Sequence, residues 1–207
     1  MKTKNIIACL LLLFVAQAVN AQNNADALIR ILVDQVKSHK NVEMAFSYQI
    51  SPDGKNYSDT QEGHAWLQGE AYKIEMTEQQ SISDGKTIWT YLVDDEEVMV
   101  SDATEGEDNT PLKLLTSLDK NYVATLTNID AQGNATIELA NPKGQYKRVT
   151  LKMNTTKAVL KSADVYLEDG TKVAVTVKEM KYDLELDDKF FTFDTKKHPK
   201  VDVIDMR

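Results

Sequence analysis

The sequence predicts an α+β fold in which a large antiparallel β-sheet is covered by short helices. The first observation is the stretch over residues 79–102, where an Asp-Gly pair and an acidic turn separate three strand-like runs. The second is the chain after Tyr122, where strand-like runs recur roughly every 10 to 13 residues, as in a large sheet, sandwich or barrel. The third is a pair of helical patterns, one before the strands and one among them.

The N-terminus is expected to be a secretory signal peptide over residues 1–21. Lys2 and Lys4 precede an apolar run over residues 6–15 that is too short to span a bilayer, and Ala21 ends a small-residue cleavage site. Cys9 lies inside this leader. Residues 22–207 are therefore expected to form one exported domain that is stabilised by its core, without a disulfide.

Charge argues against some classes of partner. Without Lys2 and Lys4 the formal charge is 22 − 32 = −10. An acidic, exported chain is a poor candidate for binding nucleic acid or anionic headgroups through its net charge.

The first helical pattern is expected to run from Ala27 to about Ser38, with Asp26 as its N-cap. Its apolar residues share one broad arc: Leu28, Ile29, Leu32, Val33 and Val36. Both a core helix and a helix that covers a cavity fit this pattern.

The next segments alternate with the period of a strand. In the run from Val42 to Ile50 one face carries Val42, Met44, Phe46, Tyr48 and Ile50. Strands over residues 60–68 and 71–76 follow, joined by Gly69-Glu70. In the second of them one face carries Tyr72, Ile74 and Met76.

The central meander has its middle strand over residues 86–93. Asp84-Gly85 predicts a type I′ hairpin turn, in which both central residues have φ > 0. Alternation places Trp89 and Tyr91 on one face of the middle strand.

Residues 103–109 are acidic, but the spacing of their carboxylates does not match a calcium-binding loop, so we expect no metal there. Thr110-Pro111 predicts the start of a second helix, because proline fits the first helical turn. This helix is apolar and too short to be stable alone, so it must dock on another element.

The later strands are expected over residues 122–129, 135–140, 147–153, 158–167 and 172–184. Asp169-Gly170 marks another tight hairpin. Phe191-Thr192-Phe193 is a candidate for closing the sheet, and residues 201–204 are a candidate last strand.

Motifs for catalysis are absent from the sequence. Residues 22–207 contain no cysteine nucleophile and no G-x-S-x-G, H-E-x-x-H or phosphate-binding glycine loop. His39, His64 and His198 lack the spacing of metal ligands. We expect a protein that is not an enzyme and that has no cofactor.

Several motifs resemble those of the outer-membrane lipoprotein carrier (LolA) family. SDGKTIWTY, over residues 83–91, is similar to the family's S-D-G-K-x-x-W-x-Y segment. EGHAWL, over residues 62–67, is similar to its G-x-x-W-[LV] strand, and FFTF, over residues 190–193, is similar to its F-x-F near the end. The order and spacing of these motifs match over nearly all of residues 22–207.

The resemblance implies an unclosed antiparallel β-barrel under a lid of short helices, with an apolar cavity between them. It also implies a periplasmic carrier that shields the acyl chains of lipoproteins between the inner and the outer membrane. An acyl chain of ~16 carbons buries on the order of 10 kcal/mol, so this cargo needs a carrier in water. The implied partners are acylated lipoproteins, an inner-membrane release complex and an outer-membrane acceptor, and we expect a monomer.

The apolar faces and the resemblance together predict the lipid-binding residues. On the sheet side they are Met44, Phe46, Tyr72, Ile74, Met76, Trp89 and Tyr91, and on the lid side they are Leu28, Leu32, Leu112, Leu115 and Leu118. A filled core would use the same residues.

The latch of the lid is expected to differ from that of well-studied family members. Those members carry an arginine just after the W-[LV] strand, and the aligned residue here is Gln68. Glutamine can still hydrogen-bond but carries no charge, so we expect a more weakly latched lid.

Two other functions stay open at this point. A lipid-binding sensor or regulatory module on the same fold would bind acyl chains without handing them on. A secreted hydrolase would need clustered carboxylates in a polar cleft.

Overall fold

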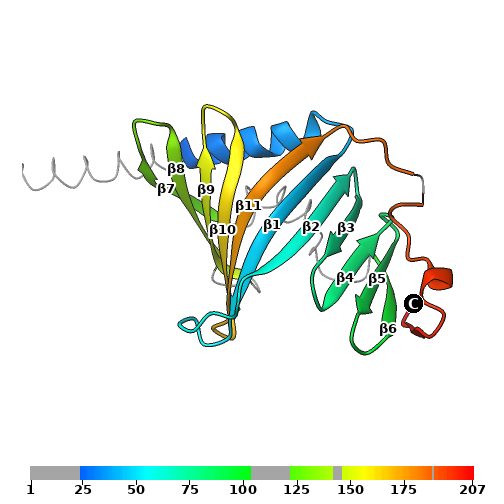
Figure 1. The fold of residues 1–207 in the computed structure, drawn as a ribbon. Helices are drawn as coiled ribbons and strands as arrows, with labels where there is room; N and C mark the ends of the chain where they lie inside the picture. The colour runs from blue at the N-terminus through cyan, green and yellow to red at the C-terminus, as the bar shows by residue number, and fades with distance from the viewer. Residues whose placement is uncertain (1–23, 104–121, 142–145, 188) are drawn as a thin grey trace, which may run out of the picture.

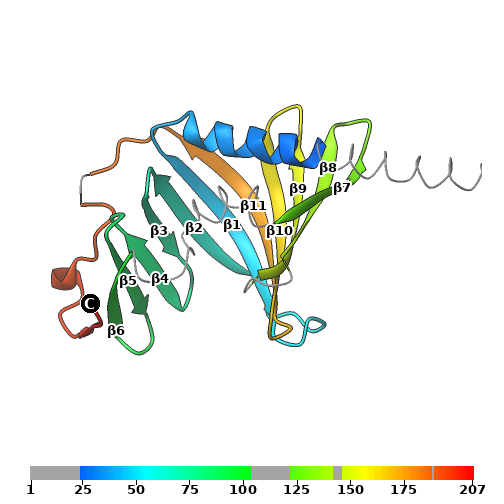
Figure 2. The ribbon, with the colours of Figure 1, turned by 180° about the vertical axis from the view of Figure 1, so that it is seen from behind.

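In the part of the chain that the structure describes, the fold is a single large, curved β-sheet with one α-helix on its concave side (Figures 1 and 2). The computed structural model describes residues 24–103, 122–141, 146–187 and 189–207. Within these ranges, twelve strands lie in the order β12-β6-β5-β4-β3-β2-β1-β11-β10-β9-β8-β7. Within the described residues, the end strands β12 and β7 do not pair with each other, so the sheet stays unclosed.

The strands follow the alternation of the sequence closely. They are Val42–Ser51 (β1), Gln61–Gln68 (β2), Ala71–Glu75 (β3), Gln79–Ser83 (β4), Thr87–Leu92 (β5), Glu97–Asp102 (β6), Val123–Ile129 (β7), Asn134–Ala140 (β8), Tyr146–Asn154 (β9), Val159–Leu167 (β10), Lys172–Tyr182 (β11) and Asp202–Asp205 (β12). All neighbouring pairs are antiparallel except β12, which runs parallel to β6.

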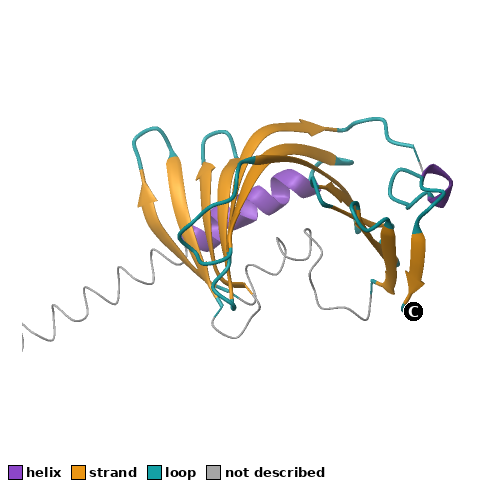
Figure 3. Ribbon diagram, turned by 60° about the horizontal axis from the view of Figure 1, so that its bottom comes forward, coloured by secondary structure: helices purple, strands orange, loops and turns teal. Residues whose placement is uncertain are grey.

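The helix covers residues 24–37 and packs under the arch of the sheet (Figure 3). Residues 24–26 are already helical, so Asp26 lies within the helix and is not its N-cap. The physical reason is Ala25, which is fully buried in the cluster that the helix forms with β7–β10. This burial stabilises the helical conformation before Ala27, where the capping pattern predicted that the helix starts.

The expected lid of short helices is not borne out, because the described residues contain one α-helix. The expected second helix, with Leu112, Leu115 and Leu118, lies outside the described residues, as do the expected signal peptide and most of the acidic run over residues 103–109. No helix among the described residues is both long enough and apolar enough to cross a bilayer.

The two Asp-Gly turns are not of type I′, because only their glycines have positive φ: Gly85 at 88° and Gly170 at 92°. Both loops are longer than two residues; Ser83, for example, pairs with Ile88. The Asp84 carboxylate accepts hydrogen bonds from the backbone N–H groups of residues 86 and 87, at 2.9 and 2.8 Å. The aspartate therefore stabilises the turn through its side chain, without itself adopting φ > 0.

The segment after β11 crosses the convex face of the sheet and returns to its edge as β12. Phe190 contacts Trp66 edge to face at 5.3 Å, and Phe193 lies 5.3 Å from the ring of Tyr91. The 3₁₀ turn Thr195–Lys197 follows. Residues 191–193 are therefore not a closing strand, because their aromatic rings pack against the sheet instead of pairing with its edge.

Candidate functional site

The pairing register assigns side chains to the two faces of the sheet, because directly opposed residues lie on the same side. Phe46 opposes Gly63 on β2 and Val177 on β11. Continuing in both directions, the same face carries Ile74 on β3 and Leu151 on β9. Leu151 belongs to the cluster that contains the helix, so this is the concave face.

The concave face is apolar across most of its strands. Its apolar residues on β8–β11 include Ile137, Leu139, Val149, Leu151, Met153, Leu160, Ala163, Val165, Val173, Val175 and Val177, and on β1–β3 they are Val42, Met44, Phe46, Tyr48, Ile50, Ala65, Leu67, Tyr72 and Ile74.

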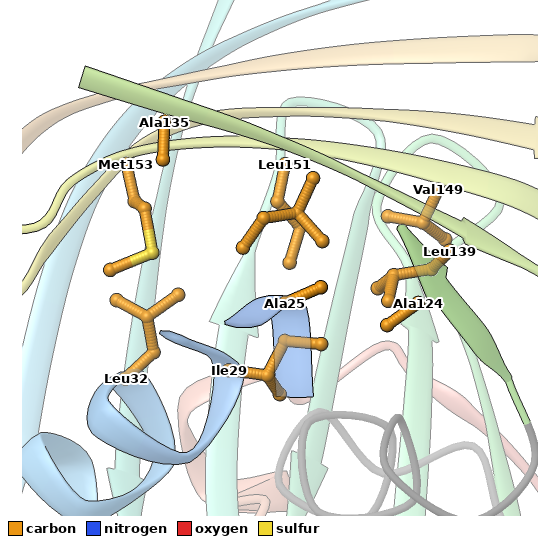
Figure 4. Close-up of a cluster of buried hydrophobic side chains, with 10 residues drawn as sticks. Ala25, Ile29, Leu32, Ala124, Ala135, Leu139, Val149, Leu151 and Met153 are labelled. Carbon is orange, nitrogen blue, oxygen red and sulfur yellow. The ribbon is translucent and has the colours of Figure 1, made fainter. Parts of the chain in front are cut away.

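One part of this face is a dense core beneath the helix (Figure 4). Ile29 and Leu32 point from the helix toward Leu151 and Met153 on β9. Ile29 and Met153 are 1% and 0% exposed, so this region is filled.

The other part lies over β1–β3 and is more loosely covered. Phe46, Tyr48 and Ala65 are buried there. The residues around them are only partly buried: Met44, Ile50, Ile74, Met76 and Val175. We call this second region the central apolar face; it is the candidate binding surface.

Gly63 shapes the central apolar face. A Cβ at this position would stand 2.5 Å from Cζ of Phe46 and 3.0 Å from the carbonyl oxygen of Glu75. The ring of Phe46 therefore lies across β2 in the space that any other residue would fill, and it presents its surface to the concave side.

The polar end of Tyr48 has partners within the protein. Its hydroxyl donates to Oε1 of Gln61 and accepts a long hydrogen bond of 3.4 Å from the backbone N–H of Thr77. Because the hydroxyl has these two partners, Tyr48 leaves no unpaired hydrogen-bond donor on the central apolar face.

The structure brings together most, but not all, of the predicted sheet-side residues. Met44, Phe46, Tyr72, Ile74 and Met76 gather on or beside the central apolar face. On the lid side, Leu32 belongs to the filled core and Leu28 packs against it.

Trp89 and Tyr91 lie on the opposite, convex face. Ser83 opposes Ile88 in the ladder, which places Ile88 on the concave face and its neighbour Trp89 on the other. Tyr91 is 7% exposed and packs against Phe193 and His198 of the C-terminal segment. Alternation told us that the two aromatics share a face, but it could not tell us which face is concave.

Sequence reasoning missed the small residues Gly63 and Ala65. Both lie opposite large side chains of β1, Phe46 and Met44. Their alternation with His64 and Trp66 was visible in the sequence, and small residues on one side of a strand are a sign that a neighbouring ring lies over it.

Gln68 lies beside the junction between the helix and β1. Its Oε1 accepts a hydrogen bond of 3.2 Å from Nδ2 of Asn41, which is 1% exposed. Asn41 also donates to the carbonyl oxygen of Leu184 at 2.9 Å and accepts from its N–H at 2.8 Å. Through Asn41, Gln68 therefore helps to hold the backbone of Leu184, just after β11, beside the start of β1.

A hollow of about 270 Å³ lies where the helix ends, beside the β2–β3 turn. It is lined by Val36, Lys37, His39, Lys40, Leu67 and Gly69. Nδ1 of His39 stands 2.7 Å from Oδ2 of Asp183 and its ring stacks on Tyr182 at 4.2 Å. The hydrogen bond with His39, together with one from the backbone of Lys40, holds the pKa of Asp183 below its ordinary value.

Comparison with known proteins agrees with this geometry. The family model described as outer membrane lipoprotein carrier protein LolA matches residues 37–194. No curated protein matches the sequence significantly.

One solved structure at low sequence identity shows the same kind of fold, and two others match with lower TM-scores. An uncharacterized conserved protein from Thermus thermophilus has 11% identity and a TM-score of 0.55, and the match covers 84% of this chain and 96% of that one. A LolA superfamily protein from Nitrosomonas europaea has 12% identity and a TM-score of 0.43, with 82% and 97% covered. LprF from Mycobacterium bovis has 12% identity and a TM-score of 0.43, with 80% and 96% covered.

Proposed function

Since the chain belongs to the outer membrane lipoprotein carrier (LolA) family, we propose that it shields the acyl chains of lipoproteins and moves them from the inner to the outer membrane. It acts in the periplasm after residues 1–21 are removed. An inner-membrane complex releases the cargo to it and an outer-membrane acceptor receives the cargo. The protein works as a monomer and by binding alone, without catalysis or a cofactor.

The central apolar face is the observation that carries this proposal. Phe46, Tyr48 and Ala65 form its floor, and Met44 and Ile74 are among the partly buried side chains around them. An acyl chain placed there gains ~0.8 kcal/mol for each methylene it removes from water. A surface of this kind suits a flexible hydrocarbon chain, because it offers apolar area without a fixed polar partner.

The lipid-contacting residues proposed here differ from those expected from the sequence. Met44, Phe46, Tyr72, Ile74 and Met76 keep this role. Leu112, Leu115 and Leu118 are proposed for the lid side, with Leu28 and Leu32 anchoring the helix. Trp89 and Tyr91 are left out, because they lie on the convex face.

Two neighbouring residues of β3 provide a matched test. Ile74 lies on the concave face and Glu75 on the convex face. Residues 22–207 have no cysteine, so Ile74→Cys and Glu75→Cys each create one labelling site after the leader is removed. With an environment-sensitive fluorophore attached, addition of a triacylated lipopeptide should shift the emission to the blue at position 74 and leave it unchanged at position 75.

The labelled proteins must first keep the thermal midpoint of the unlabelled protein. If the emission shifts equally at both positions, or at neither, the concave face is not the binding surface. A lipopeptide that shifts the emission at position 74 but stays bound when outer-membrane vesicles are added would contradict transfer, and would favour a lipid-binding sensor on the same fold.

A further inference from the structure

The hollow at the end of the helix is lined by basic side chains, although the chain as a whole is acidic. The whole chain has 32 acidic and 24 basic residues. Two lysines and a histidine line this hollow, and among the described residues no carboxylate does. Another hollow, of about 220 Å³ beside Tyr91, is also lined by two lysines and a histidine, Lys197, Lys200 and His198, but it includes the carboxylate of Glu96.

The floor of the hollow continues into the concave face. Leu67 opposes Val42 on β1 and Tyr72 on β3, so its side chain belongs to that face. Val36, in the last turn of the helix, is partly buried on the other side of the hollow. An apolar path therefore leads from the central apolar face to a basic rim.

The lysine ammonium groups of this rim are available to a ligand. Lys37 has no ion-pair partner among the described residues. Nζ of Lys40 is 3.9 Å from Oε2 of Glu185, and the two side chains are 57% and 97% exposed, so this pair is weak. His39 is already engaged, with Asp183 through Nδ1 and with the Gln35 side chain through Nε2.

We propose that the hollow binds the anionic head, a carboxylate or a phosphate, of an acylated ligand whose chain lies on the central apolar face. Lys37 and Lys40 bind the head, and His39 holds the rim in place by fixing the end of the helix to β11. The inference rests on the proposed function and adds to it a preference for ligands with a negative charge next to the acyl chain.

A simpler role exists for Lys37, because a cation in the last turn of a helix also stabilises the helix dipole. That role predicts an effect on stability alone. It predicts no preference among ligands that share one acyl chain and differ in their heads.

Three probes with the same chain test the proposal: palmitate, palmitoyl-lysophosphatidylglycerol and uncharged monopalmitoylglycerol. Their affinities for the purified protein are measured by titration with native mass spectrometry readout. We expect at least one anionic probe to bind about tenfold more tightly than the uncharged one, the ratio expected for two exposed ion pairs. Which anionic probe is preferred identifies the head as a carboxylate or a phosphate.

The double variant Lys37→Gln/Lys40→Gln should reduce this preference to about twofold or less and leave binding of monopalmitoylglycerol unchanged. Lys55→Gln/Lys152→Gln is the matched control, because it removes the same charge from exposed lysines outside the hollow. The control should keep the preference of the wild-type protein.

Equal affinity of the wild-type protein for all three probes would overturn the inference, as would an unchanged preference in the double variant. Either result leaves the proposed function standing, since the uncharged probe still binds. Failure of all three probes to bind the folded protein would overturn both the proposed function and the inference.

Discussion

At Gly63, the absence of a side chain determines where an aromatic ring lies. The ring of Phe46 occupies the position of the missing Cβ and forms part of the floor of the central apolar face. The glycine is needed for space, because it is not among the residues with positive φ. A methyl group added at residue 63 would therefore meet a ring that forms part of the binding surface.

Gly63→Ala should destabilise the protein by about 1–3 kcal/mol, the usual cost of forcing an additional carbon into a packed site. Urea unfolding measures this cost. In a Phe46→Leu background the same change should cost much less, because the ring that the methyl group meets is gone. An equal cost in both backgrounds would show that the clash is with the backbone of Glu75 instead.

Asn41 and Gln68 share a hydrogen bond but should contribute very differently to stability. Asn41→Ala removes three hydrogen bonds and leaves both backbone groups of Leu184 without their partner, at a cost of about 2–3 kcal/mol. Gln68→Ala removes one long hydrogen bond and should cost about 0.5–1 kcal/mol. Chemical denaturation of both variants makes the comparison.

If Gln68→Ala costs as much unfolding free energy as Asn41→Ala, Gln68 stabilises the fold by more than its one hydrogen bond to Asn41.

Hydrogen exchange tests the expected weak latch of the lid. Amides of residues 104–121 that are protected as strongly as those of β9 and β10, without ligand, would contradict it.

Among the elements, the helix over residues 24–37 has two different ends. Its first half is anchored in the filled core through Ala25, Ile29 and Leu32. Its last turn carries Val36 and Lys37 beside the hollow. Such an arrangement allows the end of the helix to adjust to a ligand while the beginning stays docked.

Ile29→Ala should cost about 2–5 kcal/mol, because it opens a cavity in the filled core. Ile31 is 41% exposed on the same helix, and Ile31→Ala should change stability by no more than about 0.5 kcal/mol. Thermal and urea unfolding of the two variants provide the measurement. Similar costs at both positions would show that the helix is not held by the face that the structure assigns to it.

On the scale of the whole molecule, aspartates at turns and chain ends link stability to pH. Hydrogen bonds lower the pKa of five of them: Asp53, Asp130, Asp169, Asp183 and Asp205. For Asp205 the main cause is the side chain of Arg207, which lowers the pKa to about 2. For Asp130 it is the side chain of Asn134.

The lowered pKa values of these five aspartates predict how the stability of the protein falls at low pH. A carboxyl whose pKa is lower in the folded state stabilises the protein fully above its unfolded pKa, about 3.9 for aspartate, and loses this contribution as pH falls through the folded pKa. The urea midpoint should therefore be insensitive to these five groups between about pH 5 and 7 and fall below about pH 4. Asp130→Asn should make the fall below pH 4 shallower, and an unchanged slope in this variant would contradict the assignment.

The strands of this protein could be predicted because their signal is local. Val42–Ser51 alternates with period two, and that period depends only on the geometry of one strand. The buried arc of the helix around Ile29 and Leu32 follows from the helical period in the same way. The motif around Trp89, together with the supporting motifs, likewise indicated the family, which the family model confirms.

By itself, then, the sequence determined the strands, the buried arc of the helix and the family. Only the tertiary structure decided which face is concave, that Trp89 and Tyr91 lie on the convex face, and that β12 runs parallel to β6. It also decided that His39 meets Asp183, 144 residues away, beside the basic hollow. The physical reason is that strand register and packing between distant segments depend on contacts across the whole chain, and no local period encodes them.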